Sequence, residues 1–230
     1  MIEPKARLES PALLIVDMQN DFVREGAPLE VPDARATIAA HQALIAAFRE
    51  RARPVIYTKF LATPYPSLLW NWSPQCRPET KCCWKGHKRT YQDSSHALEC
   101  SDIIAEIYPQ PGDPIVEKYG YGAFHGTALA DMLHALGVGS LALTGTVTQI
   151  CVEESGREAF HHGFMTTMVT DAVSSFAPDL QAATLKNFAA KFGWVADHEA
   201  LVAALKNLVK PFQNNKKLGI GANRMVTFVG

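Results

Sequence analysis

The sequence predicts an α/β protein built on a doubly wound, mostly parallel sheet. Short apolar runs alternate with stretches of helical spacing along most of the chain, and this alternation is typical of parallel strands joined by crossover helices. The length of 230 residues, with 47% hydrophobic and 20% charged residues, suits an ordinary globular domain with its own core. We therefore expect a single domain over residues 1–230.

Each expected element follows from one of these two patterns. Apolar runs predict strands at residues 12–17, 54–59, 114–118, 140–145 and 165–171, with a weaker sixth at 192–196. Helical spacing lies between or after them, and it predicts helices at about 34–51, 126–136, 149–162, 179–190 and 197–208. In chain order, strand and crossover helix therefore alternate.

Residues 60–100 break this alternation. They carry four prolines, three tryptophans and the adjacent pair Cys82 and Cys83. Long segments of this kind in compact domains are usually functional or disordered, and the aromatic residues argue against disorder. We expect an insert that forms a lid or a contact between subunits, and an extended tail at 210–230 that frays or packs on another subunit.

Composition narrows the classes of partner. The net charge of -1 provides no basic field for nucleic acid or an anionic membrane, so a small-molecule substrate is favoured. No apolar stretch of signal-peptide or membrane-spanning length occurs, which predicts a cytoplasmic protein. The five cysteines form no regular framework and predict reduced thiols. Those of the insert also lack the paired short spacing of a structural zinc site, so we expect no metal.

Three reactive side chains lie at or just after predicted strand ends, which is where ligands bind in open parallel sheets. Asp17 ends the first strand, Lys118 ends the third, and Cys151 follows the fourth across a short turn. Taken singly, each has an ordinary structural explanation: an aspartate that caps a turn, a solvated lysine and a small buried cysteine.

Taken together, they indicate acyl transfer. A thiol at the first turn of a helix, with an ammonium nearby, has a lowered pKa, so we expect Cys151 to be available as thiolate at neutral pH. Asp17 is suited to take the thiol proton and return it to a departing amine. Lys118 is suited to pair with both anions. The backbone amides of Val147 and Cys151 are candidates for an oxyanion hole.

The stretches "ALLIVDMQNDFV", "EKYGYGAFHGTAL" and "LTGTVTQICVEESGREA" resemble the isochorismatase-like cysteine hydrolases, over about residues 12–208. The resemblance implies a Rossmann-like three-layer α/β/α sandwich with a six-stranded sheet, assembled as a homodimer or homotetramer. It implies a catalytic triad of Asp17, Lys118 and Cys151. It also implies a cis peptide bond between Thr146 and Val147 that turns the Val147 amide toward the oxyanion.

Departures from particular members narrow the expected reaction. The cysteine favours amide hydrolysis through a thioester over the vinyl-ether cleavage of isochorismatases. The metal-binding Asp-x-His group that nicotinamidases share has no counterpart in "YTKFLATPYPSLLWNW". We therefore expect a cofactor-free and metal-free amidohydrolase that cleaves a ureido or carbamoyl compound and releases ammonia. A nicotinamidase-like amidase, a vinyl-ether hydrolase and a non-enzymatic assembly or partner-binding module remain alternatives.

Five further residues are candidates for the substrate pocket. Phe22, Phe124 and Trp84 would form an apolar wall, while Arg77 or Arg89 would pair with a substrate carboxylate. Core packing explains the two phenylalanines about as well, and a solvated surface loop is the alternative for the basic part of the insert.

Overall fold

The central sheet consists of six parallel strands. The structure, a computed structural model, describes residues 8–208. The strands are β1 (Pro11–Val16), β2 (Val55–Phe60), β5 (Ile115–Lys118), β6 (Ser140–Thr146), β7 (Met165–Ser174) and β8 (Trp194–Ala196). Their order across the sheet is β5-β2-β1-β6-β7-β8. The direction of chain progression therefore reverses between β1 and β6, and such a switch point opens a crevice at the carboxyl ends of the strands.

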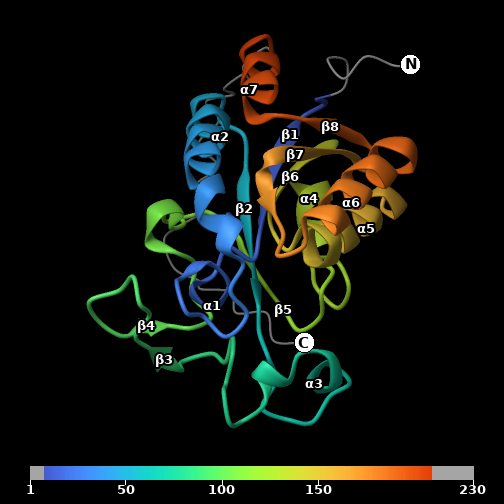
Figure 1. Ribbon diagram of the computed structural model, residues 1–230. Helices are drawn as coiled ribbons and strands as arrows, with labels where there is room; N and C mark the ends of the chain where they lie inside the picture. Colours follow the sequence, from blue (N-terminus) through green and yellow to red (C-terminus); the bar gives the residue numbers. More distant parts are fainter. Residues whose placement is uncertain (1–7, 209–230) are drawn as a thin grey trace, which may run out of the picture.

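Helices cover both faces of the sheet, as Figure 1 shows. One face packs against α2 (Ile38–Glu50) and α7 (His198–Lys206), and the other against α4 (Leu129–Ala135), α5 (Glu153–His161) and α6 (Pro178–Lys191). Strand β1 is buried throughout, with Leu13 and Ile15 in one core and Ala12, Leu14 and Val16 in the other. Side chains of a strand alternate between faces, so a strand between two helical layers is apolar at every position.

The predicted fold class is confirmed, including all six strands and the five main helices. Two helical stretches are divided: a 3-10 turn, η2 (Pro32–Thr37), precedes α2, and a π-helical turn, η5 (Thr148–Val152), precedes α5. The patterns predicted neither division, because the apolar spacing continues through both junctions. Within residues 8–208, no helix combines the length and the hydropathy that crossing a bilayer requires.

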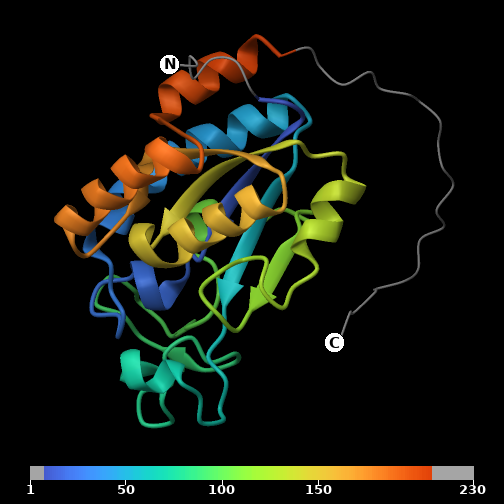
Figure 2. The same cartoon turned by 90° about the vertical axis from the view of Figure 1, so that its right-hand side faces the viewer.

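The insert between β2 and β5 runs from residue 61 to residue 114, which is longer than predicted. It contains α3 (Leu69–Trp72), η3 (Pro74–Cys76), the two-stranded hairpin of β3 (Lys88–Arg89) and β4 (Leu98–Glu99), and η4 (Ala105–Ile107). In Figure 2 the arrowheads of β2 and β5 point toward it, so the insert lies beyond the carboxyl edge of the sheet. The predicted tail at 210–230 lies outside the described residues.

A short helix that the sequence did not predict, α1 (Asn20–Val23), connects the insert to β1. The backbone amide of Asp21 donates to the carbonyl of Cys100 at 3.1 Å. The backbone amide of Ile104 donates to the carbonyl of Met18 at 3.0 Å. The side-chain amide of Gln19 donates to the carbonyls of Phe60 (2.9 Å) and Ser101 (2.8 Å). The later part of the insert is therefore fixed to the chain that follows β1.

Candidate active site

Asp17 directly follows β1 and is fully buried. Its backbone has a φ of 51°, in the left-handed region that aspartate tolerates better than most residues. The hydroxyl of Thr58, on the neighbouring strand β2, donates to Asp17 Oδ1 at 2.6 Å and accepts from the Asp17 amide at 3.2 Å. The carboxylate is thus held in one orientation from the next strand.

Lys118, the last residue of β5, reaches Asp17 across β2. Its Nζ lies 2.7 Å from Asp17 Oδ2, and both side chains are fully buried. The ammonium also donates hydrogen bonds to the carbonyls of Tyr121 (2.8 Å) and Gly120 (3.1 Å). Oδ2 has this charge contact but no aligned hydrogen bond, so it keeps a lone pair that can take a proton. Burial alone would lower the pKa of Lys118, but the adjacent Asp17 carboxylate and the Cys151 sulfur raise it, so the lysine stays charged.

Cys151 lies in η5 and is 5% exposed. Its carbonyl accepts a hydrogen bond from the Ser155 hydroxyl at 2.6 Å, and that hydroxyl accepts one from the Ala123 amide at 3.0 Å. Ser155 therefore joins the turn that carries the cysteine to the loop that follows Lys118. Single π-helical turns are frequent at functional sites.

The thiol of Cys151 retains its proton at neutral pH. Its pKa is raised to about 12, first because the group is buried and further because the Asp17 carboxylate lies beside it. Lys118 and the Val147 backbone amide act in the opposite direction but do not outweigh burial. The expectation of a thiolate at neutral pH is therefore wrong, because one ammonium already paired with Asp17 cannot offset desolvation of the sulfur.

The bond between Thr146 and Val147, where the resemblance implies a cis peptide, is cis in this structure. Val147 is 6% exposed, and its amide lies close enough to the sulfur of Cys151 to lower the pKa of the thiol. The three predicted catalytic side chains and this amide therefore meet at one point of the sheet edge.

The chain also matches known proteins in sequence and in fold. Residues 11–200 match the profile of the Isochorismatase domain, which covers most of the chain. The chain belongs to the isochorismatase family.

Three relatives illustrate the range within this family. A ureidoacrylate amidohydrolase of Rhizobium rhizogenes is 33% identical over 194 residues, which are 80% of this chain and 79% of the relative. The N-carbamoylsarcosine amidase of Thermoplasma acidophilum is 27% identical with a TM-score of 0.65, covering 82% of this chain and 96% of that one. A cysteine hydrolase of Pseudomonas syringae pv. phaseolicola has a TM-score of 0.76 at 23% identity, covering 89% and 94%, and so shows the fold alone.

Aromatic side chains that the sequence reasoning missed lie beside the triad of this isochorismatase-family site. The ring of Phe60 lies 5.5 Å from Lys118 Nζ and 6.5 Å from the ring of Tyr121. Burial raises the pKa of Tyr121, Ser73 lowers it by hydrogen bonding, and the sulfur of Cys151 raises it, so the phenol lies near both. Thr58 and Phe60 lie two residues apart at the carboxyl end of β2, so both side chains are on the same face of the strand. Their position at a strand end beside Asp17 could have identified them from the sequence.

The five predicted pocket residues fall into different environments. Phe22 lies 6.2 Å from Phe60 and so belongs to the aromatic cluster beside Lys118. Phe124 stacks on His162 at 5.1 Å, at the end of α5 remote from Cys151, so core packing accounts for it. Trp84 is half-buried, and its indole donates to the carbonyl of Cys76 at 2.7 Å.

The two predicted arginines also differ. Arg89 pairs with the fully buried Asp21 at 2.9 Å and donates to the carbonyl of Thr80 at 2.8 Å. Its guanidinium already neutralises a buried carboxylate, and its binding of a substrate carboxylate stays a prediction. Arg77 is exposed and forms no ion pair among residues 8–208, so it remains a candidate.

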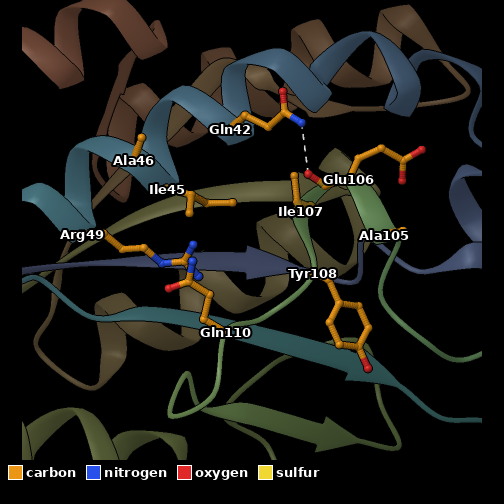
Figure 3. Close-up of a pocket in the computed structure, with 9 residues that line it drawn as sticks. All are labelled: Gln42, Ile45, Ala46, Arg49, Ala105, Glu106, Ile107, Tyr108 and Gln110. Atoms are coloured by element: carbon orange, nitrogen blue, oxygen red, sulfur yellow. Dashed lines mark hydrogen bonds between the residues drawn. The ribbon is translucent and has the colours of Figure 1, made fainter.

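A separate hollow of about 420 Å³ lies between α2 and the segment that contains η4. Figure 3 shows Gln42 and Arg49 on the helix facing Tyr108 and Gln110 on the segment. Gln42 donates to the carbonyl of Glu106 at 3.0 Å, and the Arg49 guanidinium pairs with Asp113. No member of the triad lines this hollow, so it is not the pocket in which the triad would act.

Proposed function

We propose that this protein is a cysteine amidohydrolase that cleaves a small amide, of ureido or carbamoyl type, through a thioester and releases ammonia. The observation that carries the proposal is the buried cluster of Asp17, Lys118 and Cys151 in a chain of the isochorismatase family. Relatives named ureidoacrylate amidohydrolase and N-carbamoylsarcosine amidase support the substrate class.

The first step is attack by the thiol of Cys151. Because the thiol is protonated at rest, Asp17 takes its proton while the sulfur bonds to the substrate carbonyl carbon. Oδ2 of Asp17 is the atom that receives the proton, because Oδ1 already accepts from the Thr58 hydroxyl and the only contact of Oδ2 among the described residues is with the Lys118 ammonium. Lys118 balances the negative charge during the transfer, and the amides of Val147 and Cys151 stabilise the oxyanion.

Collapse of the tetrahedral intermediate completes acylation. Asp17 returns the proton to the departing nitrogen, the carbon–nitrogen bond breaks, and ammonia leaves with the acyl group bound to sulfur. Asp17 then removes a proton from a water molecule that attacks the thioester. The proton returns to the sulfur as the acid product leaves, so the enzyme is regenerated.

An ammonia-release screen tests the proposal. The wild-type chain is assayed on ureidoacrylate, biuret, N-carbamoyl amino acids, nicotinamide and simple aliphatic amides, beside Cys151→Ser and Cys151→Ala. We expect release from a ureido or carbamoyl compound, and a loss of at least about 10³-fold in both variants, as is usual when a nucleophile is removed. Full turnover by Cys151→Ala would contradict the thioester route and favour chemistry by Asp17 alone.

A substitution of Arg77 tests whether this side chain binds a carboxylate of the substrate. If this side chain recognises a carboxylate, Arg77→Glu raises the KM of acidic substrates and leaves that of neutral amides unchanged. Equal effects on both classes would remove Arg77 from the pocket.

A further inference from the structure

Cysteines of the insert gather beside Asp21 of α1, a carboxylate that the catalytic scheme does not use. Cys76, Cys82 and Cys83 are all fully buried, and none of them is in a disulfide. The sulfurs of Cys82 and Cys83 are 3.8 Å apart. One oxygen of Asp21 and the sulfurs of Cys82 and Cys83 all lie within 4.8 Å of one another.

These separations suit coordination by a small tetrahedral ion. Two thiolates bound to zinc at about 2.3 Å lie about 3.8 Å apart when the geometry is tetrahedral, and this equals the separation of the Cys82 and Cys83 sulfurs. A tetrahedral zinc site places a carboxylate oxygen about 3.6 Å from each sulfur, and one Asp21 oxygen lies within 4.8 Å of both sulfurs.

Hydrogen bonds and an ion pair hold the Asp21 carboxylate in a fixed orientation, as in many metal sites. Its Oδ2 accepts from the Cys83 amide at 2.8 Å, while its Oδ1 accepts from the Tyr91 hydroxyl at 2.7 Å and lies 2.9 Å from Arg89 Nε. Metal-binding carboxylates are usually held by such outer partners. Oδ1 already accepts from two donors, whereas Oδ2 accepts one hydrogen bond and can still offer a lone pair to a cation.

The charges favour a divalent ion. Asp21 with Cys82 and Cys83 as thiolates carries three negative charges, which Arg89 and one dication balance. A bound dication stabilises the thiolates that ligate it.

We propose that Asp21, Cys82 and Cys83 bind one divalent thiophilic metal ion of the zinc type, which joins the insert to α1. The spacing of the cysteines alone predicted no metal, because the ligand that completes the group comes from outside the insert. The site does not depend on the proposed amide hydrolysis, and it is tested without measuring turnover.

The first experiment measures metal content. The full chain is produced in zinc-supplemented medium, purified without chelators and analysed by mass spectrometry of the metal. We expect about one zinc ion per chain, and a decrease of at least about tenfold in Cys82→Ser and Cys83→Ser. Cys100→Ser is the matched control and should retain zinc. Cys100 is equally buried in the insert, but its sulfur lies 3.2 Å from Arg89 Nε and is not one of the proposed ligands.

A second measurement keeps the proposal testable if the serine variants fail to fold. Wild-type protein is unfolded with a chelator, freed of metal and refolded with Co²⁺, which should give the thiolate charge-transfer and visible bands of a tetrahedral cobalt–sulfur site. Wild-type protein that purifies without metal and gives no such bands would overturn the proposal. So would a disulfide within Cys76, Cys82 and Cys83, located by peptide mass spectrometry of the metal-free protein.

Discussion

At the scale of single residues, the candidate site works through burial. Asp17 and Lys118 are fully buried partners, and the thiol of Cys151 is protonated because the same desolvation acts on it. The three residues could be identified from sequence because each lies in a short motif at a strand end. The protonation state could not, since it depends on how much solvent three distant segments exclude together.

Thr58 is a positioning residue for Asp17, and removal of its hydroxyl tests this role. In Thr58→Val the hydrogen bond to Asp17 Oδ1 is lost, and we expect kcat to fall about tenfold, corresponding to about 1.4 kcal/mol. KM should stay unchanged, because Thr58 lies behind the carboxylate. Steady-state ammonia release measures both constants. Thr58→Ser keeps the hydroxyl and should restore most of kcat; equal losses in the two variants would indicate a packing effect instead.

The raised pKa of Cys151 predicts how the thiol reacts with iodoacetamide. Below a pKa of about 12, the thiolate fraction increases about tenfold with each pH unit. The alkylation rate should therefore keep increasing from pH 7 to pH 10, whereas a free thiol with the ordinary pKa of 9.0 levels off. Peptide mass spectrometry follows the label, with Cys151→Ser as the reference. A rate already constant at neutral pH would show that the thiolate predominates at rest.

At the scale of elements, the junction between β6 and η5 sets the position of the nucleophile. Gly145 pairs with Val16 in the register of β6 and β1, so the two strand ends that carry Asp17 and Cys151 approach closely. Sequence patterns located both strands to within a few residues. They missed α1 and the insert hairpin of β3 and β4, because these short elements are stabilised by contacts with distant chain segments and show no periodicity of their own.

Gly145→Ala tests how closely those strands approach. The residue has a φ of 107°, and a Cβ there would lie 2.0 Å from the carbonyl oxygen of Val16. We expect the free energy of unfolding to fall by about 3 kcal/mol or more, from backbone strain and the clash together. Urea denaturation measures the loss. Gly137→Ala is the control, since Gly137 has a φ of 66° and open space around it. This substitution should lower the free energy of unfolding by about 1–2 kcal/mol. Equal losses in the two variants would mean that strands β1 and β6 separate easily.

At the scale of the whole molecule, the three-layer architecture follows from the alternation of apolar runs and helical spacing along the sequence. The path of the insert does not follow from it, because its contacts join Asp21 to Cys83, Tyr91 and Arg89 across more than sixty positions. Contacts between residues so far apart in the sequence leave no local pattern from which they could be predicted.

His41 gives the folded chain a defined sensitivity to acid. It is fully buried in α2, its Nδ1 lies 2.9 Å from the Thr37 carbonyl, and burial lowers its pKa from 6.5 to about 4, although that carbonyl and Asp171 raise it. Between these two pH values only the unfolded chain takes up the proton, so stability falls as the pH falls from about 6.5 to about 4. At pH 5 the loss should be about 2 kcal/mol relative to pH 7.

Urea denaturation of wild type and His41→Leu at both pH values isolates this contribution. The variant should lose about 2 kcal/mol less than wild type on acidification. Identical losses would show that His41 accepts a proton in the folded state.

The homodimer or homotetramer implied by the family resemblance remains a prediction. Light scattering should give two or four times the chain mass of 25.2 kDa, because closed symmetric assemblies are the usual oligomers. A mass of one chain at micromolar concentration would contradict it.

The connection between α1 and the insert restricts how this protein can be re-engineered. Exchanging residues 61–114 with the corresponding loop of a relative, in order to transfer its substrate preference, would separate Arg89, Tyr91 and Cys83 from the carboxylate of Asp21. A chimera that left this aspartate in place would contain an uncompensated buried charge four residues after Asp17. The helix and the loop are therefore one unit of recombination, although they are far apart in the gene.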